Sequence, residues 1–358
     1  MSGSPYASAL GRLKAHLPSF LSKDQVTRLV GAPDLAEIAK ALETTAYGPA
    51  IVAAASSYSG ATLLEIGINR TFVQRNRQAY ESASFAGKPI VGAYLRRWDI
   101  ENISLILSSK AQGRTITETE SFLVSSRDTP AGLFAGVLTI DEFRRLLDQP
   151  SLEAVASALV PYGYGATLLP LLEGYGRTHD IFPLVQALER EYYAKLLSSL
   201  LFFQGDEWVV RQFVQGEIDA RNVLLLLKGK DGDQPADVVG DRWIDGGTLA
   251  RATVGEVYGA RDVPELVKSL EPRFPTLAEG LVPYHDERSL TGFEVALQRD
   301  RAVKELRRMR AYPLSLAILF TYMLLAEVER GDLRRIIYGK LYGFPAARIE
   351  ALLVLPQL

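Results

Sequence analysis

The residues with the clearest chemical pattern belong to a polar signature that occurs three times in the chain. Each copy has an acidic residue, an Asn or Asp three positions later, an aliphatic residue next, and a Lys eight positions after the Asn or Asp. The copies consist of Asp99, Asn102 and Lys110, of Asp219, Asn222 and Lys230, and of Glu329, Asp332 and Lys340. Carboxylates and ammonium groups could form ion pairs or take part in acid–base chemistry.

On a helix, the acid and the Lys of one copy lie about three turns apart, because one turn takes roughly 3.6 residues. They are therefore too far apart along the axis to pair with each other. The Asn or Asp between them could bond a backbone group of a neighbouring helix. We interpret the signature as polar contacts that set the register of packed helices, rather than as a catalytic site.

Other motifs that could carry chemistry are incomplete. The Gly163-Tyr-Gly165 segment lacks the Gly-Lys-Ser/Thr ending of a phosphate loop, and it predicts a helix-ending turn instead. The segment after Lys230 resembles a calcium loop only in part, because Pro235 stands at a ligand position and the spaced Glu is missing. The chain has no Cys and only three scattered His. The sequence therefore predicts a protein that is not an enzyme and that has no cofactor and no metal site.

The composition also narrows the class of protein. Lys and Arg number 40 and Asp and Glu number 42, and this balance argues against a nucleic-acid-binding protein. Hydrophobic residues make up 47% of the 358 residues, which is ample for a large core in two or three domains. The longest apolar stretch, Tyr312 to Ala326, is shorter than the roughly 20 residues that span a bilayer. We expect no transmembrane segment, and we expect this stretch to form a core helix.

Two further blocks repeat upstream of the signature, in the same order. In the first block, apolar steps of three and four residues predict short amphipathic helices, and Asp34 and Ser151 are the expected N-caps. Its matched positions are Val26, Leu29, Pro33, Leu35, Ile38, Leu42 and Tyr47 in the first copy and Phe143, Leu146, Pro150, Leu152, Val155, Leu159 and Tyr164 in the second, with a weaker third copy at Val254, Val257, Val263, Leu266 and Leu270. The second block ends at Arg70, Arg190 and Arg299, which precede the signature acids by 29, 29 and 30 residues.

The fold predicted from these blocks is all-α, with three similar helical bundles. Each unit is expected to contain a short helix pair, a long helix, a turn and a second long helix. The turn signals are Gly87-Lys-Pro89, Gly205-Asp206 and Tyr312-Pro313. The predicted organisation is an N-terminal segment over residues 1–20, followed by helical units over residues 21–136, 137–247 and 248–358.

Each turn lies about midway between a repeated Arg and the following signature acid. In an antiparallel helix pair, residues equidistant from the turn lie at the same height. The sequence therefore predicts partly buried ion pairs between Arg70 and Asp99, between Arg190 and Asp219, and between Arg299 and Glu329. Removal of one partner from such a pair costs about 3–5 kcal/mol when the pair is buried.

Basic residues also gather near the ends of the second long helices. Two interpretations stay open at this point: compensation of helix dipoles on solvated faces, or a polar rim that docks a partner protein. The residues of the possible docking rim are Arg96, Arg97, Arg114, Lys228, Arg334 and Arg335.

The triplicated signature resembles the C subunit of the A-type and V/A-type ATP synthases, whose equivalent in the vacuolar enzymes is the d subunit. Residues 98–103 and 217–223 carry the resemblance best, together with the link over residues 242–247 and the C-terminal stretch over residues 334–345. The resemblance covers nearly the whole chain, from about Leu21 to Val354.

This resemblance implies a funnel of three pseudo-symmetric helical units. It also implies a place on the cytoplasmic face of the membrane, where the protein would sit on the proteolipid ring, hold the foot of the central stalk and pass torque between them. The family has neither an active site nor a cofactor. The alternative is a helical-repeat scaffold for protein interactions in a soluble complex, but solenoid repeats run to roughly 20–50 residues, much shorter than these units.

Overall fold

The computed structural model describes residues 4–113, 136–202 and 208–354, and every regular element in these ranges is helical. This result confirms the all-α prediction. The long helices are α5 (Gly60–Ser82), α6 (Lys88–Ala111), α12 (Phe182–Ser199), α13 (Trp208–Asp231), α18 (Thr291–Arg310) and α19 (Ala317–Leu341). The three copies of the signature lie on α6, α13 and α19, which we call the signature helices.

Three groups of short helices separate the long ones. The first group contains α1 (Ala7–His16), η1 (Leu17–Ser19), α2 (Lys23–Gly31), α3 (Leu35–Glu43) and α4 (Gly48–Ala55). The second contains α8 (Ile140–Leu147), α9 (Leu152–Ala158), η2 (Val160–Tyr162), α10 (Gly165–Leu168), η3 (Leu169–Leu171) and α11 (Leu172–Thr178). The third contains α14 (Ala236–Asp241), α15 (Thr253–Val257), α16 (Val263–Leu270), η5 (Pro275–Gly280) and α17 (Leu281–Glu287). The remaining elements are η4 (Leu200–Phe202) and α20 (Ala346–Ala351).

The short helices begin where the sequence predicts. The Asp34 carboxylate accepts a hydrogen bond from the backbone N–H of Glu37 (2.9 Å), and the Ser151 hydroxyl accepts one from that of Ala154 (3.2 Å). Both expected N-caps are therefore confirmed. Asp262 caps α16 in the same way, and the apolar positions of α16 pack into the core that it shares with α13 and α18.

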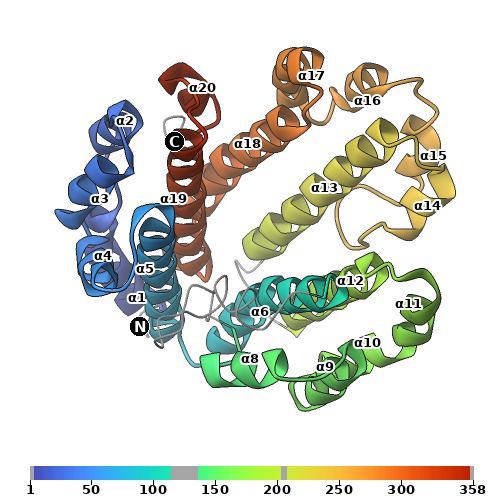
Figure 1. Ribbon diagram of the computed structural model, residues 1–358, viewed down its shortest axis with the longest axis horizontal. Helices are drawn as coiled ribbons and strands as arrows, with labels where there is room; N and C mark the ends of the chain where they lie inside the picture. The colour runs from blue at the N-terminus through green and yellow to red at the C-terminus, as the bar shows by residue number, and fades with distance from the viewer. Residues whose placement is uncertain (1–3, 114–135, 203–207, 355–358) are drawn as a thin grey trace.

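The long helices pack chiefly against helices from other parts of the chain. Figure 1 shows α5 beside α19, α6 beside α12 and α13 beside α18, with the short helices towards the outer ends of these pairs. The expectation that α5 pairs along its length with α6, and α12 with α13, is wrong. Each signature helix packs instead against the first long helix of the next copy. The last signature helix, α19, packs against α5 of the first copy. Within the described ranges, α18 and α19 are the one pair of long helices from a single copy that also packs extensively.

The apolar core follows the same connectivity. One cluster joins residues of α2–α5 to Leu333, Ile336 and Ile337 of α19 and to the C-terminal Leu353. Another joins Val223 and the rest of the outer half of α13 to α14–α18. The largest cluster includes the end of α6 together with α8–α10 and α12. Each signature helix thus shares a core with the short helices that follow it, and the N-terminal short helices pack against the C-terminal signature helix.

Candidate functional site

The first polar contact of interest joins α6 to the segment before α8. Asp99 is completely buried, and its carboxylate accepts hydrogen bonds from the backbone N–H groups of Val137 (2.8 Å) and Leu138 (3.3 Å) and from the Tyr164 hydroxyl (2.8 Å). A Cβ on Gly136 would lie 2.2 Å from the carboxylate oxygen, so this close approach requires glycine. Burial raises the pKa of Asp99 to about 6, and the three hydrogen bonds only partly offset this effect.

The same arrangement joins α13 to the segment before α15. The carboxylate of Asp219 accepts hydrogen bonds from the backbone N–H of Leu249 (2.9 Å) and from the Thr248 hydroxyl. The residue before Thr248, Gly247, again allows close approach, because its Cβ would lie 2.2 Å from Asp219 Oδ1. Leu249 precedes its apolar block by the same number of residues as Leu138, so the two contacts are equivalent in the repeat.

The third arrangement joins α19 to the segment before α2, near the other end of the chain. Glu329 is completely buried and accepts hydrogen bonds from the backbone N–H of Leu21 (2.6 Å) and from the Tyr47 hydroxyl (2.6 Å). Leu21 and Tyr47 correspond in the repeat to Leu138 and Tyr164. Burial, followed by the charge of Glu329, raises the pKa of Tyr47 well above its usual range, so this hydroxyl stays protonated and donates.

An arginine completes the third contact. Arg75 Nη1 lies 2.5 Å from Glu329 Oε1, and both side chains are buried. Its Nη2 donates to the carbonyl of Ser19 (2.9 Å), and its guanidinium lies 4.0 Å from the centre of the Phe20 ring. Burial would lower the pKa of Arg75, but Tyr47 and Glu329 outweigh burial and raise it, so the group is charged.

The three signature acids therefore form a cyclic set of contacts, which we call the junctions. The first copy binds the short helices of the second, the second binds those of the third, and the third binds those of the first. Each junction uses an acid on a signature helix and the backbone N–H of an equivalent leucine. The sequence identifies the three acids, but it predicts partners within the same copy, whereas the partners lie in the next copy.

The predicted pairing of the signature acids with the repeated arginines is wrong. Arg190 Nε donates to the carbonyl of Trp243 (3.1 Å), and Arg299 donates to the carbonyl of Leu353 (2.9 Å) and pairs with Glu279. Arg70 is half-buried and forms no ion pair with Asp99. The physical reason is that α5 and α6, and likewise α12 and α13, do not pack along their lengths, so the arginine of one helix does not face the acid of the other.

The other signature residues also make repeated contacts. Asn222 exchanges two hydrogen bonds with the backbone of Ile244 (2.8 and 3.0 Å), and Asp332 accepts one from the N–H of Val354 (3.0 Å), at the same separation of 22 residues. The expected bond to a backbone group therefore forms, but its partner lies in the segment that follows the next short helix, α14 or α20. Asn102, the equivalent residue of the first copy, is buried as well.

Two of the three signature lysines bond the short helices of the next copy. Lys110 Nζ donates to the carbonyl of Leu147 (2.7 Å) at the end of α8, and Lys230 Nζ donates to that of Tyr258 (2.8 Å) at the end of α15. These two carbonyls are equivalent in the repeat. Lys340 is half-buried and makes no matching bond within the part of the chain that the structure describes.

A buried ion network connects the signature helices at another level. Arg97 of α6 lies 2.9 Å from Glu217 of α13 and 3.4 Å from Glu327 of α19, and Arg301 of α18 contacts the same two acids at 3.1 and 3.6 Å. The Tyr193 hydroxyl of α12 donates to Glu217 (2.6 Å). Burial would raise the pKa of Glu217, but Arg97, Arg301 and the other cations outweigh it and lower the pKa to about 2. Arg97, Glu217 and Glu327 each stand two residues before a signature acid, so the repeat places them at equivalent positions. The signature does not include these positions, because the residue type changes from Arg in the first copy to Glu in the other two.

Comparison with known proteins gives the family. The model of the ATP synthase (C/AC39) subunit family matches residues 9–352. The chain belongs to this family. It is 35% identical over 349 residues to the C subunit of the A-type ATP synthase of Thermoplasma volcanium, with 98% of each chain covered. The corresponding protein of Thermoplasma acidophilum is 34% identical over 351 residues, with 98% of each chain covered. That of Haloferax volcanii is 30% identical over 359 residues, covering 99% of this chain and 98% of the relative.

In this family member, three of the six residues of the predicted docking rim form ion pairs within the chain. Arg97 is buried in the ion network, Arg335 bonds Asp332 (2.8 Å), and Arg334 pairs with Glu65 (3.0 Å). Arg97 therefore cannot belong to an exposed rim, because its side chain is used inside the fold, whereas a docking role for the other residues stays a prediction. Lys228 is exposed, Arg96 is half-buried, and Arg114 lies outside the described residues.

Two further observations concern possible cofactors and membrane contact. Across the described ranges, no cluster of three or more His, Cys, Asp and Glu residues could hold a metal ion. No helix within the same ranges is both long enough and apolar enough to cross a bilayer. The apolar stretch Tyr312–Ala326 supplies the buried first part of α19 and the turn before it.

Proposed function

We propose that this chain is a non-catalytic rotor component of an A/V-type rotary ATPase. In this role it sits on the cytoplasmic face of the membrane, connects the central stalk to the proteolipid ring, and passes torque between them. It works as a funnel of three pseudo-symmetric units, over residues 21–136, 137–247 and 248–358, after an N-terminal segment over residues 1–20. Membership of the C/AC39 family and the relatives from A-type ATP synthases support this proposal.

The cyclic set of junctions is the observation that carries the proposal. An open row of helical units can twist at any link, whereas in a closed cycle a twist at one link must strain the other links too. Here the last link closes through Glu329, which joins residues more than 300 positions apart. Buried, well-packed contacts resist deformation, because packed interiors have low compressibility. A part that transmits torque needs this stiffness.

The buried ion network adds a second level of connection. Arg97 and Arg301 each contact both Glu217 and Glu327, so one cluster connects helices of all three copies. Separation of any one copy would leave buried charges unpaired, which costs several kcal/mol, about 3–5 for a broken buried pair. The helices are thus held together both by the junctions and by this network.

Rotation of the chain with the stalk is the direct test. This chain contains no Cys, so Lys228→Cys on its exposed surface gives a single labelling site on the chain, and a synthase with unsubstituted Lys228 controls for labelling of other subunits. The purified synthase would be fixed to a surface through its catalytic subunits, and a gold rod would be attached to this cysteine. We expect ATP to drive rotation of the rod in steps. A rod that stays still while the enzyme hydrolyses ATP would contradict the proposal.

Removal of the chain provides a second readout. In membrane vesicles, ATP-driven ion pumping should be lost when the chain is absent and should return when it is added back, while ATP hydrolysis by the catalytic part persists. Pumping that is undiminished without the chain would also contradict the proposal.

A further inference from the structure

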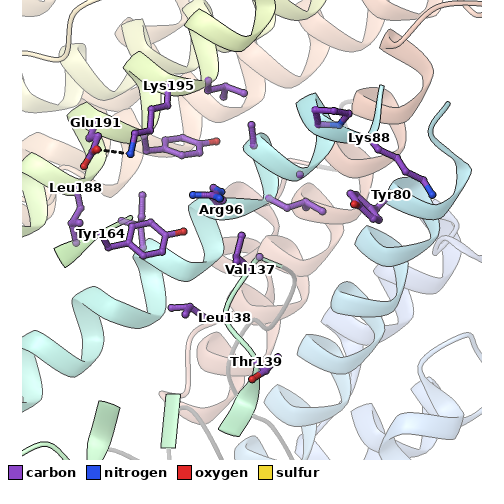
Figure 2. Close-up of a pocket in the computed structure, with 18 of the residues that line it drawn as sticks. Tyr80, Lys88, Arg96, Val137, Leu138, Thr139, Tyr164, Leu188, Glu191 and Lys195 are labelled. Atoms are coloured by element: carbon purple, nitrogen blue, oxygen red, sulfur yellow. Dashed lines mark ion pairs between the residues drawn. The ribbon is translucent and has the colours of Figure 1, made fainter. Parts of the chain in front are cut away.

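A large cavity opens between α5, α6, α12 and the segment that leads into α8. Its volume is about 890 Å³, within the range of sites that bind ligands, which is roughly 300–1,000 Å³. Figure 2 shows Arg96 in the middle of the cavity, with Tyr164 and Lys195 on one side and Tyr80 and Lys88 on the other. The cavity borders the first junction, because Val137, Leu138 and Tyr164 belong to both.

The cavity carries a marked excess of positive charge. Its wall contains four basic residues (Arg77, Lys88, Arg96 and Lys195) and one acidic residue, Glu191. Glu191 is already paired with Lys195 at 2.5 Å. Arg77, Lys88 and Arg96 form no ion pair with any described residue; Lys88 instead lies 5.7 Å from the centre of the Tyr80 ring. The cavity thus offers three cations to a ligand.

Arg96 has an acidic neighbour on its own helix, but that acid is occupied. The charge of Arg96 acts on the carboxyl of Asp99, which is bonded by Val137, Leu138 and Tyr164. The guanidinium of Arg96 lies 6.0 Å from the centre of the Tyr164 ring and interacts with its hydroxyl. A guanidinium has five N–H donors, so Arg96 keeps most of them for a ligand in the cavity.

The spacing of the cations indicates the shape of the ligand. Lys88 and Arg96 are eight residues apart on α6, which is about 12 Å along a helix axis. Figure 2 shows the Lys88 side chain extending away from Arg96, so in this arrangement one phosphate or carboxylate would contact only one of them. An extended peptide advances about 3.3 Å per residue, so two acidic side chains three or four positions apart match this distance.

The rest of the wall is suited to a peptide as well. Pro89, Val137 and Ile140 give it an accessible apolar surface, and Tyr80 adds an aromatic ring with a hydroxyl group. Such a surface binds apolar side chains between the acidic ones, while tyrosine hydroxyls can bond a peptide backbone.

We propose that this cavity binds an extended acidic segment of another protein, in which two acidic residues three or four positions apart flank apolar ones. The choice of the other synthase subunits as the source of that segment rests on the proposed function. The peptide site itself is a property of the isolated chain. The binding tests below can therefore fail while the rotation assay succeeds, and the reverse, so the two proposals are tested separately.

The first test measures binding to the isolated full-length chain. The probes are fluorescein-labelled, overlapping 15-residue peptides that cover the other subunits of the synthase, and the readout is fluorescence anisotropy. We expect acidic peptides of the stated pattern to bind, more weakly at high salt. Arg77→Glu and Lys88→Glu should each weaken binding about tenfold, as charge reversal at a complementary site does. The matched control is Lys40→Glu, whose side chain is 74% exposed and lies outside the cavity.

The competing occupant is a small anion, and a second probe separates it. Inorganic tripolyphosphate that binds the cavity more tightly than every acidic peptide, with the same loss in Lys88→Glu, would overturn the proposal. Absence of any bound peptide, or binding that Arg77→Glu and Lys88→Glu leave unchanged, would overturn it too.

The second test uses the assembled synthase. A photo-reactive p-benzoylphenylalanine replaces Tyr80, which is 39% exposed at the edge of the cavity. We expect irradiation to join this position to an acidic segment of another protein of the synthase, identified by mass spectrometry. Products that contain only this chain or only lipid would overturn the proposal.

Discussion

The substitution Glu329→Gln tests the closing junction most directly. The carboxylate is completely buried and accepts from three donors, Leu21 N–H, the Tyr47 hydroxyl and Arg75. A glutamine keeps the shape but replaces one acceptor oxygen with a donor group, so at least one of these donors loses its partner. Arg75, whose side chain is 4% exposed, keeps its charge and loses its counter-ion.

Breaking a buried ion pair on one side costs about 3–5 kcal/mol. With a typical unfolding entropy per residue, this loss lowers the melting temperature by about 4–7 °C if the whole chain unfolds as one unit. The matched control is Glu37→Gln, which breaks an exposed pair with Lys40 and should cost at most about 1 kcal/mol. Urea unfolding followed by circular dichroism gives the free energies of unfolding of both variants.

A double-mutant cycle with Arg75→Met attributes the effect to the pair. The double variant, Arg75→Met with Glu329→Gln, should lose less stability than the sum of the single variants, by about 2 kcal/mol, because neither partner is left alone. Hydrogen exchange adds a local readout, since the amide of Leu21 should exchange faster in Glu329→Gln while that of Leu138 stays protected. A loss for Glu329→Gln no larger than that for Glu37→Gln would refute the reasoning.

Three further predictions follow from the junctions. Gly247→Ala should destabilise the protein by about 1–3 kcal/mol, the usual cost of overpacking, because the added Cβ would meet the Asp219 carboxylate. The control in the same urea assay is Gly255→Ala, whose added Cβ would have no atom nearby. Tyr47→Phe should cost about 1–3 kcal/mol, since it removes a donor from a buried charged acceptor. The pKa of Asp99 is raised to about 6, so the folded state binds the proton of this carboxyl more tightly than the unfolded state does. The free energy of unfolding should therefore fall by about 3 kcal/mol as pH rises from about 4 to about 6. In Asp99→Asn, this part of the pH dependence of unfolding should be absent.

Each of these predictions has an outcome that contradicts it. Equal losses for Gly247→Ala and Gly255→Ala would show that the close approach at the second junction is not needed. An unchanged unfolding midpoint in Tyr47→Phe would show that the hydroxyl adds nothing to the third junction. A difference between the wild type and Asp99→Asn that stays constant from pH 4 to pH 6 would show that Asp99 does not titrate there.

The positions of short helices and their caps could be predicted from the sequence. Asp34 and Ser151 bond backbone groups only three residues away, so their role depends on local chain geometry alone. The apolar period of the same blocks depends on the turn of a single helix. The threefold signature was also visible, because equivalent positions in a repeat keep similar side chains.

The partners of the signature acids could not be predicted in this way. The sequence pairs Asp99 and Glu329 with arginines of the preceding long helix if each copy forms its own antiparallel helix pair. They bind Leu138 and Leu21 instead. The clustering of basic residues along the chain suggests a surface rim that includes Arg97, whereas Arg97 lies in the buried ion network.

By itself, the sequence determined the helical class, the caps and the existence of a repeated polar signature, because these features arise from neighbours within a few residues. Only the tertiary structure decided that Glu329 closes a cycle with Leu21 and that Arg97 meets Glu217. The physical reason is that the angle at which two long helices leave a turn is set by apolar packing against distant segments. That angle, more than the spacing of charges along the chain, selects which buried groups can reach each other.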